Sequence, residues 1–281
     1  MDQESLLLAA LDVLFPDRSY FGGRTLGIQG VPARHLYLSA AVWQFADLDR
    51  PVRLLEIGSW VGASALTFAQ AIDAFCAKKG SIVCVDPWLD YFSAADAGTR
   101  GYAEMTDLNQ LGLSNALFQH NIRFARPSVA IERRRGTARD VLPTLEADTF
   151  DLVYIDGSHY RDDVVFDIQH GRRLLRDGGL LCGDDLELQA GDCDRAFAEA
   201  NLDRDFVCDA KGRSFHPGVT LAVDSELGPV SAYDGFWIMR KTGATVAPVA
   251  LRGANFIVPD HFPTGLQAKL VALAHGRPVG G

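Results

Sequence analysis

Short apolar runs alternate with longer amphipathic segments along most of this 281-residue chain. Apolar runs bounded by turn residues are typical of buried strands, and apolar residues at three- and four-residue spacing are typical of helices. The expected strands are residues 52–57, 81–85, 129–132, 150–155 and 180–182, and the expected helices are 63–77, 138–145, 160–175 and 190–200. This alternation predicts a mostly parallel sheet with helices on both faces.

Two more apolar runs, 218–223 and 236–239, follow without a helical segment between them. We expect this pair to add antiparallel strands at one edge of the sheet. The predicted fold class is therefore α/β, a Rossmann-like and mostly parallel seven-stranded sheet with an antiparallel edge strand and helices on both faces.

The pattern also divides the chain into three parts. These are an N-terminal helical cap segment (1–50), a core (51–245) that carries an insertion (87–127), and a C-terminal tail (246–281). Helical patterns occur at 6–14 and 32–48 in the cap segment and at 266–274 in the tail. We expect the cap segment to pack across the first strand or to cover a bound cofactor.

Composition narrows the classes of function. A net charge of −9 does not provide the broad basic face that nucleic-acid binding needs. No apolar run reaches the ~18 residues of a membrane span, and the N-terminus carries Asp2 and Glu4 instead of a basic signal region. The five cysteines are odd in number and form no C-x-x-C pair, which is typical of free thiols in a reducing compartment. We therefore expect a cytoplasmic protein that acts on neither nucleic acid nor membranes.

Residues 54–64 form the most informative loop. An apolar run ends at Glu56, Gly58 and Gly62 bracket a turn, and a helical pattern follows. A dinucleotide fingerprint would need a second glycine where this loop has Trp60, and an indole leaves poor room for a pyrophosphate. The loop better suits a nucleoside cofactor without phosphates, of which S-adenosylmethionine (SAM) is the commonest. The alternative is that the glycines only make a tight turn between strand and helix.

Four of the predicted strands end in carboxylates. These are Glu56, Asp86, Asp156 and the pair Asp184–Asp185. Because the carboxyl ends of parallel strands lie at one edge of a sheet, we expect these acids to converge. Asp86 sits where an acid accepts the ribose hydroxyls of a nucleoside, and Glu56 fits the same cofactor. The alternative is that these two acids cap helices.

The remaining acids, Asp156, Asp184 and Asp185, fit a metal ion. Three carboxylates without a thiol are hard oxygen ligands, which suit Mg²⁺, Ca²⁺ or Mn²⁺. Like charges this close raise each other's pKa unless a cation neutralises them. Ordinary loop acids in Asp-Gly and Gly-Asp turns are the alternative.

His159 follows three residues after Asp156, before the predicted helix 160–175. We expect Ser158 to cap this helix and the helix N-terminus to disfavour the imidazolium, so that His159 stays neutral near pH 7 and takes a proton. The alternative is a first-turn histidine that points into solvent. His216 is a further candidate for the substrate side.

From about Val52 to Arg240 the chain resembles class I SAM-dependent methyltransferases. The loop Glu-Ile-Gly-Ser-x-x-Gly-x-Ser, residues 56–64, resembles that of the metal-dependent catechol and caffeoyl-CoA O-methyltransferases. The block 155–160, followed by the block 180–185, resembles the macrocin and mycinamicin sugar O-methyltransferases and the cephalosporin hydroxylase-like family.

The resemblance implies roles for individual residues. SAM would be bound by Glu56, Gly58, Ser59, Gly62, Ser64, Asp86 and Asp156, Mg²⁺ or another hard divalent cation by Asp156, Asp184 and Asp185, and His159 would act as the base. The implied activity is O-methyl transfer to a hydroxyl of a small molecule of the sugar or natural-product type. Self-association is implied as well, because methyltransferases of this type often form homo-oligomers.

Two other functions stay open at this point. The first is a non-catalytic SAM-fold binding or scaffold subunit of the cephalosporin hydroxylase-like type. The second is a nicotinamide oxidoreductase on a similar fold, against which Trp60 speaks.

Overall fold

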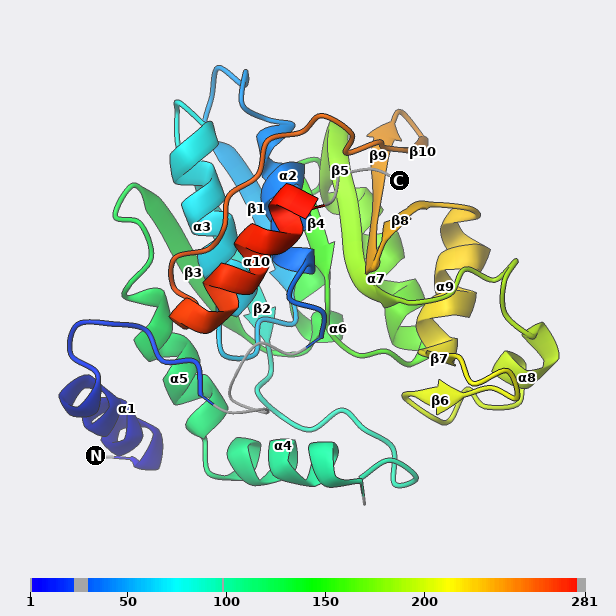
Figure 1. Cartoon of the computed structure of the whole chain (residues 1–281), viewed down its shortest axis with the longest axis horizontal. Helices are drawn as coiled ribbons and strands as arrows, with labels where there is room; N and C mark the ends of the chain where they lie inside the picture. The colour runs from blue at the N-terminus through cyan, green and yellow to red at the C-terminus, as the bar shows by residue number, and fades with distance from the viewer. Residues whose placement is uncertain (1, 23–29, 98, 277–281) are drawn as a thin grey trace.

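The computed structural model describes residues 2–22, 30–97 and 99–276. Within these residues an eight-stranded sheet has the order β10-β9-β5-β4-β1-β2-β3, with β8 paired to β9 (Figure 1). Its strands are β1 (Val52–Ile57), β2 (Gly80–Asp86), β3 (Val129–Arg135), β4 (Phe150–Ile155), β5 (Leu175–Leu186), β8 (Ser231–Tyr233), β9 (Gly235–Thr242) and β10 (Thr245–Pro248). Strands β1 to β5 pair in parallel, and β8, β9 and β10 are antiparallel additions. The predicted mostly parallel sheet with an antiparallel edge is confirmed.

Helices cover both faces of this sheet (Figure 1). They are α1 (Gln3–Leu14), α2 (Arg34–Trp43), α3 (Ala63–Phe75), α4 (Arg100–Gln110), α5 (Leu113–Ile122), α6 (Ala138–Val141) with the 3₁₀ turn Leu142–Thr144, α7 (Arg161–Leu174), α8 (Arg195–Glu199), α9 (Pro217–Leu227) and α10 (Thr264–Gly276). Leu54 and Leu152 belong to the core with α2 and α3, whereas their chain neighbours Leu55 and Val153 belong to the core with α7 and α9. Because side chains alternate along a strand, strands that are apolar on both faces require two helical layers.

The predicted strand 218–223 is wrong, because these residues lie inside α9. Pro217 is the first residue of the helix. Proline has no backbone N–H, and at this position an N–H would have no intrahelical acceptor, so no hydrogen bond is lost. Val219, Ala222 and Val223 then recur at helical spacing and are buried in the core with α7. A short apolar run does not distinguish a strand from a buried helix by itself. The partner run 236–239 does form an antiparallel strand, β9, next to β5.

The predicted helix 190–200 is wrong in its first half, because only α8 is helical there. Asp194 caps α8 by accepting the backbone N–H of Phe197, which fixes the start of the helix at Arg195. After α8 two short strands, β6 (Val207–Cys208) and β7 (Ser214–Phe215), pair with each other outside the main sheet.

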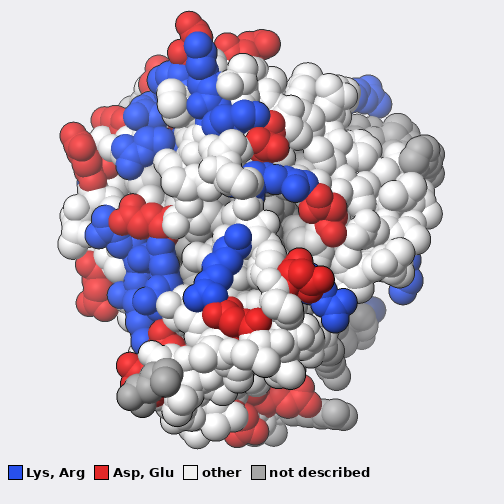
Figure 2. Space-filling view, turned by 90° about the vertical axis from the view of Figure 1, so that its left-hand side faces the viewer, with Lys and Arg blue, Asp and Glu red and all other residues white. Residues whose placement is uncertain are grey.

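The side of the molecule that carries α1, α5 and β3 shows interspersed basic and acidic side chains (Figure 2). Arg133 and Arg135 pair with Glu4, and Arg134 pairs with Glu132. Two carboxylates thus offset part of the charge of the three arginines at the end of β3. All five cysteines carry free thiols, as expected. Among the described helices, none is both long and apolar enough to cross a membrane.

Candidate active site

Gly58 is the point where the ends of β1, β2 and β4 meet. Its φ is +83°, and a Cβ there would lie 1.9 Å from the backbone oxygen of Asp156. Its N–H donates to the carbonyl of Val85 over 2.9 Å. Gly62 is also left-handed, with φ +89°, and faces the ring of Phe118. Both glycines are required by the fold, and the loop that we predict to hold SAM lies against the strand end that carries Asp156.

Glu56 is buried at the end of β1. Its Oε2 accepts a hydrogen bond from Ser59 Oγ at 2.6 Å, whereas its Oε1 has no hydrogen-bond partner within the described residues. Burial raises the pKa of Glu56, and hydrogen bonds with Ser59 and Ser64 oppose that shift. A buried oxygen without a partner is an acceptor that a ligand's N–H or O–H can satisfy. This geometry suits the predicted cofactor role of Glu56.

Asp86 organises the same loop from the end of β2. Its Oδ2 accepts the backbone N–H groups of Ser59 and Trp60, both at 2.9 Å, and its Oδ1 accepts that of Trp88 at 2.6 Å. The contacts of Asp86 are therefore with backbone, and its contact with a ribose stays a prediction. The indole of Trp60 packs with the apolar cluster that joins α1 to α5.

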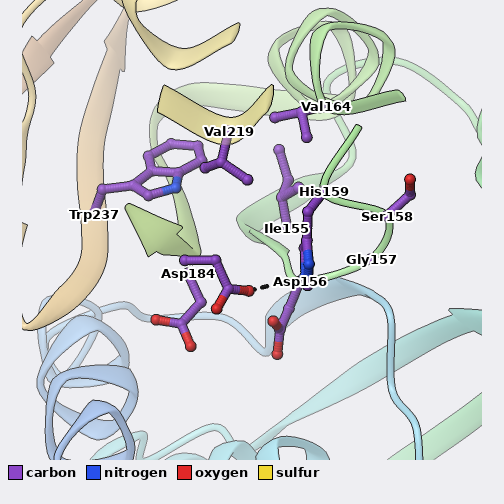
Figure 3. A pocket seen from close by; sticks show the side chains of 10 residues that line it. Ile155, Asp156, Gly157, Ser158, His159, Val164, Asp184, Val219 and Trp237 are labelled. Carbon is purple, nitrogen blue, oxygen red and sulfur yellow. Dashed lines mark ion pairs between the residues drawn. The ribbon is translucent and has the colours of Figure 1, made fainter. Parts of the chain in front are cut away.

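Asp156 and Asp184 lie together at the carboxyl edge of the sheet (Figure 3), and Asp185 belongs to the same cluster. Each offers one carboxylate oxygen, and these oxygens lie within 4.8 Å of one another. Neighbouring residues of a regular strand point to opposite faces. Here the pairing of β5 with β9 shifts register between Gly183 and Leu186, and Asp185 has φ +62°. This irregularity lets two consecutive carboxylates approach Asp156.

The three carboxylates fit a hard divalent cation. They supply only oxygen donors, as Mg²⁺, Ca²⁺ and Mn²⁺ prefer. A cavity of about 10 Å³ lies among them, about the room of one water molecule. The cavity is lined by Ile155, Asp156, Gly157, Ser158, His159, Val164, Asp184, Asp185, Val219 and Trp237.

Arg34, a residue that the sequence analysis missed, reaches into this cluster from the start of α2. Its Nη1 donates a hydrogen bond to Asp184 Oδ2 and lies 3.5 Å from Asp156 Oδ2. The side chain is only 9% exposed, so the ion pair with Asp184 is buried. Tyr154 donates a further hydrogen bond to Asp156 Oδ2 at 3.1 Å.

The three carboxylates differ in their affinity for a proton. Burial raises the pKa of Asp156 well above its usual value, with Arg34 opposing and the other two acids reinforcing the shift. Burial likewise raises the pKa of Asp184. Burial also disfavours the charged form of Asp185, but the neighbouring histidines outweigh it and lower the pKa of this carboxyl. Asp185 therefore carries the most firmly fixed negative charge of the three.

His159 lies between two carboxylates. Its Nε2 is 3.0 Å from Asp185 Oδ2, and its Nδ1 is 3.0 Å from Asp205 Oδ1. Burial lowers the pKa of the imidazole, but these two negative charges outweigh it and raise the pKa well above its ordinary value. The expectation that His159 stays neutral near pH 7 is therefore wrong, because two direct ion pairs exceed the weaker field of a helix end.

The expected cap of α7 is wrong as well. Ser158 donates its hydroxyl hydrogen to Asp163 Oδ2 at 2.8 Å, and the N-cap residue is Tyr160, without a side-chain cap hydrogen bond.

His216, expected on the substrate side, lies next to His159 with ring centroids 4.5 Å apart. Its Nδ1 is 3.0 Å from Glu187 Oε1.

Comparison with known proteins finds similarity to methyltransferases. Residues 55–186 match the family described as "Methyltransferase domain". The O-methyltransferase hkm8 of Aspergillus hancockii is 28% identical over 148 residues, which cover 52% of this chain and 47% of that protein. The chain thus matches about half the length of this curated relative.

The chain is also similar to two solved structures, and it shares its fold with the first of them. The O-methyltransferase NovP has a TM-score of 0.51 at 16% sequence identity, covering 86% of this chain and 100% of that one. The calicheamicin methyltransferase CalS11 has a TM-score of 0.44 at 16% identity, covering 85% and 93%. The Rossmann-like class I methyltransferase fold that the sequence resembles is confirmed.

Proposed function

We propose that this chain, in which residues 55–186 match the methyltransferase-domain family, transfers a methyl group from SAM to a hydroxyl of a small molecule of the sugar or natural-product type. One observation supports this most. Asp156, Asp184 and Asp185 meet at the sheet edge where Gly58 brings the predicted cofactor loop against Asp156. The relatives hkm8 and NovP, both O-methyltransferases by name, favour the same class of reaction.

The acceptor would bind beside the three carboxylates. A divalent cation held by them would lower the pKa of an acceptor hydroxyl. SAM supplies the methyl group. Glu56 and the backbone of the loop 58–62 would fix the cofactor, while the rigid ends of β4 and β5 would fix the acceptor side. Alignment of this kind can supply about 7–11 kcal/mol of the barrier reduction.

His159 is the proposed proton acceptor. In its neutral form an N–H at Nδ1 would donate to Asp205, which leaves Nε2 on the side of the acidic cluster as the basic nitrogen. Because Asp185 and Asp205 raise its pKa, His159 is free to accept a proton only at a pH above the usual imidazole range. Turnover should therefore increase with pH through that raised pKa.

Binding and turnover test the proposal together. SAM should raise the melting temperature of the protein, and Asp156→Ala should remove Mn²⁺ binding, measured by calorimetry, together with methyl transfer. Full transfer in excess EDTA would contradict the metal role. No thermal shift with SAM, with or without Mg²⁺, would favour the scaffold alternative. Self-association stays a prediction that light scattering can test.

A further inference from the structure

The proposed reaction gives no role to Arg34, although its guanidinium lies inside the acidic cluster. Nη1 contacts Oδ2 of Asp184 and lies 3.5 Å from Oδ2 of Asp156. Its Nε is buried and has no hydrogen-bond partner within the described residues. Within the described residues, Nη1 holds the guanidinium against the same two carboxylates that fit a divalent cation.

A divalent cation and this guanidinium cannot share those oxygens. A Mg²⁺ or Mn²⁺ ion lies about 2.1 Å from each of its oxygen ligands. An ion bound to Oδ2 of both Asp156 and Asp184 would occupy the region where Nη1 now lies, and two positive charges at contact distance repel strongly in a buried site. Binding of one therefore requires departure of the other.

The backbone that carries Arg34 is firmly anchored. The next residue, His35, has Nδ1 2.7 Å from Thr67 Oγ1 of α3, and its ring packs edge-on against Phe262 with centroids 4.7 Å apart. The guanidinium itself lies close to the chain at Gly30, where a Cβ would be 2.9 Å from Nη1. With α2 fixed in this way, an exchange at the acids involves rotation of the long Arg34 side chain and not movement of the helix.

We propose that Arg34 is a resident counter-cation, which neutralises Asp184 and Asp156 until a divalent cation displaces its guanidinium. This inference rests on the proposed function, because the divalent cation is part of that proposal. It explains how Asp156 and Asp184 can both be buried beside Asp185, whose own charge is paired with His159. It also means that the wild-type chain binds the metal more weakly than its acids alone would, because the ion must first displace Arg34.

The test compares Mn²⁺ affinity, measured from the electron paramagnetic resonance signal of free Mn²⁺, in the wild type and in Arg34→Met. We expect the variant to bind Mn²⁺ at least about tenfold more tightly, since the competing charge is gone. Arg50→Met is the matched control, because Arg50 also pairs with a buried carboxylate, that of Asp151, but outside the acidic cluster. Its Mn²⁺ affinity should equal that of the wild type. Arg34→Gln, which also removes the charge, serves if Arg34→Met does not fold, and its affinity should lie above that of the wild type.

Two results would overturn the proposal. One is equal or weaker Mn²⁺ binding by the Arg34 variants, which would mean that the guanidinium and the ion coexist. The other is the absence of Mn²⁺ binding at millimolar concentration in every protein. Thermal stabilisation by SAM, measured on the same samples, separates these failures from failure of the proposed methyl transfer, because it needs neither Arg34 nor the metal.

Discussion

The substitution Gly58→Ala tests how closely the cofactor loop is tied to the acidic site. The added Cβ would lie 1.9 Å from Asp156 O and 2.7 Å from the Cα of Gly157, and these backbone atoms cannot rotate away. The left-handed φ of +83° adds about 1–2 kcal/mol for a residue with a side chain. Overpacking adds about 1–3 kcal/mol. We expect the free energy of unfolding to fall by about 3 kcal/mol, which corresponds to a fall of about 6–12 °C in melting temperature for a chain of this size.

Gly112→Ala is the matched control for this prediction. Gly112 is also left-handed, with φ +72°, but a Cβ there meets no atom within 4 Å among the described residues. Gly112→Ala should lower the free energy of unfolding only by the cost of the left-handed backbone, about 1–2 kcal/mol. Urea unfolding measures both losses, and calorimetry measures SAM binding. Because relief of the contact at Gly58 moves the end of β4, this variant alone should bind both SAM and Mn²⁺ more weakly. Equal stability losses in the two variants would refute the argument from close approach.

Two further predictions concern buried charges. Asp151→Asn should lower the free energy of unfolding by about 2 kcal/mol at pH 7. Burial raises the pKa of Asp151, but hydrogen bonds from Arg50 and from the backbone of Arg53 outweigh it and hold this pKa below its usual value, so the stabilisation is present above about pH 4 and is lost as the pH falls further. Urea midpoints of variant and wild type should then differ at pH 7 and approach each other as the pH falls below about 4. Asp205→Asn should shift the NMR titration of the His159 imidazole to lower pH, and an unchanged titration would show that Asp205 does not raise its pKa.

Much of the fold could be predicted from the sequence where local pattern and long-range packing agree. Strands β1 and β4 begin and end at the predicted residues, because each is an apolar run bounded by turn-forming residues. The meeting of Asp156 with Asp184 and Asp185 follows from the same pattern, since parallel neighbours end at one edge. The predicted strand at 218–223 is wrong because a short apolar run fits both the two-residue repeat of a strand and the 3.6-residue repeat of a helix.

The missed parts of the site come from segments whose position the local pattern does not determine. Arg34 lies 150 residues from Asp184 in the chain, and an arginine at a helix start gives no signal that it will be buried. Asp205 lies in an irregular stretch between α8 and β6, 46 residues from His159. The wrong protonation state of His159 has the same origin, because the helix end is visible in the sequence and the two opposing carboxylates are not.

The antiparallel edge of the sheet has a direct effect on the acidic site. A Cβ on Gly183 would lie 2.5 Å from the ring of Trp237, so the missing side chain allows β9 to lie close against β5. The register then shifts, and Asp185 adopts a left-handed backbone that costs about 1–2 kcal/mol. Its ion pair with His159 at 3.0 Å helps to offset that cost. On a regular β5, one of Asp184 and Asp185 would face the opposite side of the sheet, and Asp156 would have a single partner. The three-carboxylate cluster therefore depends on the edge strand as much as on the acids themselves.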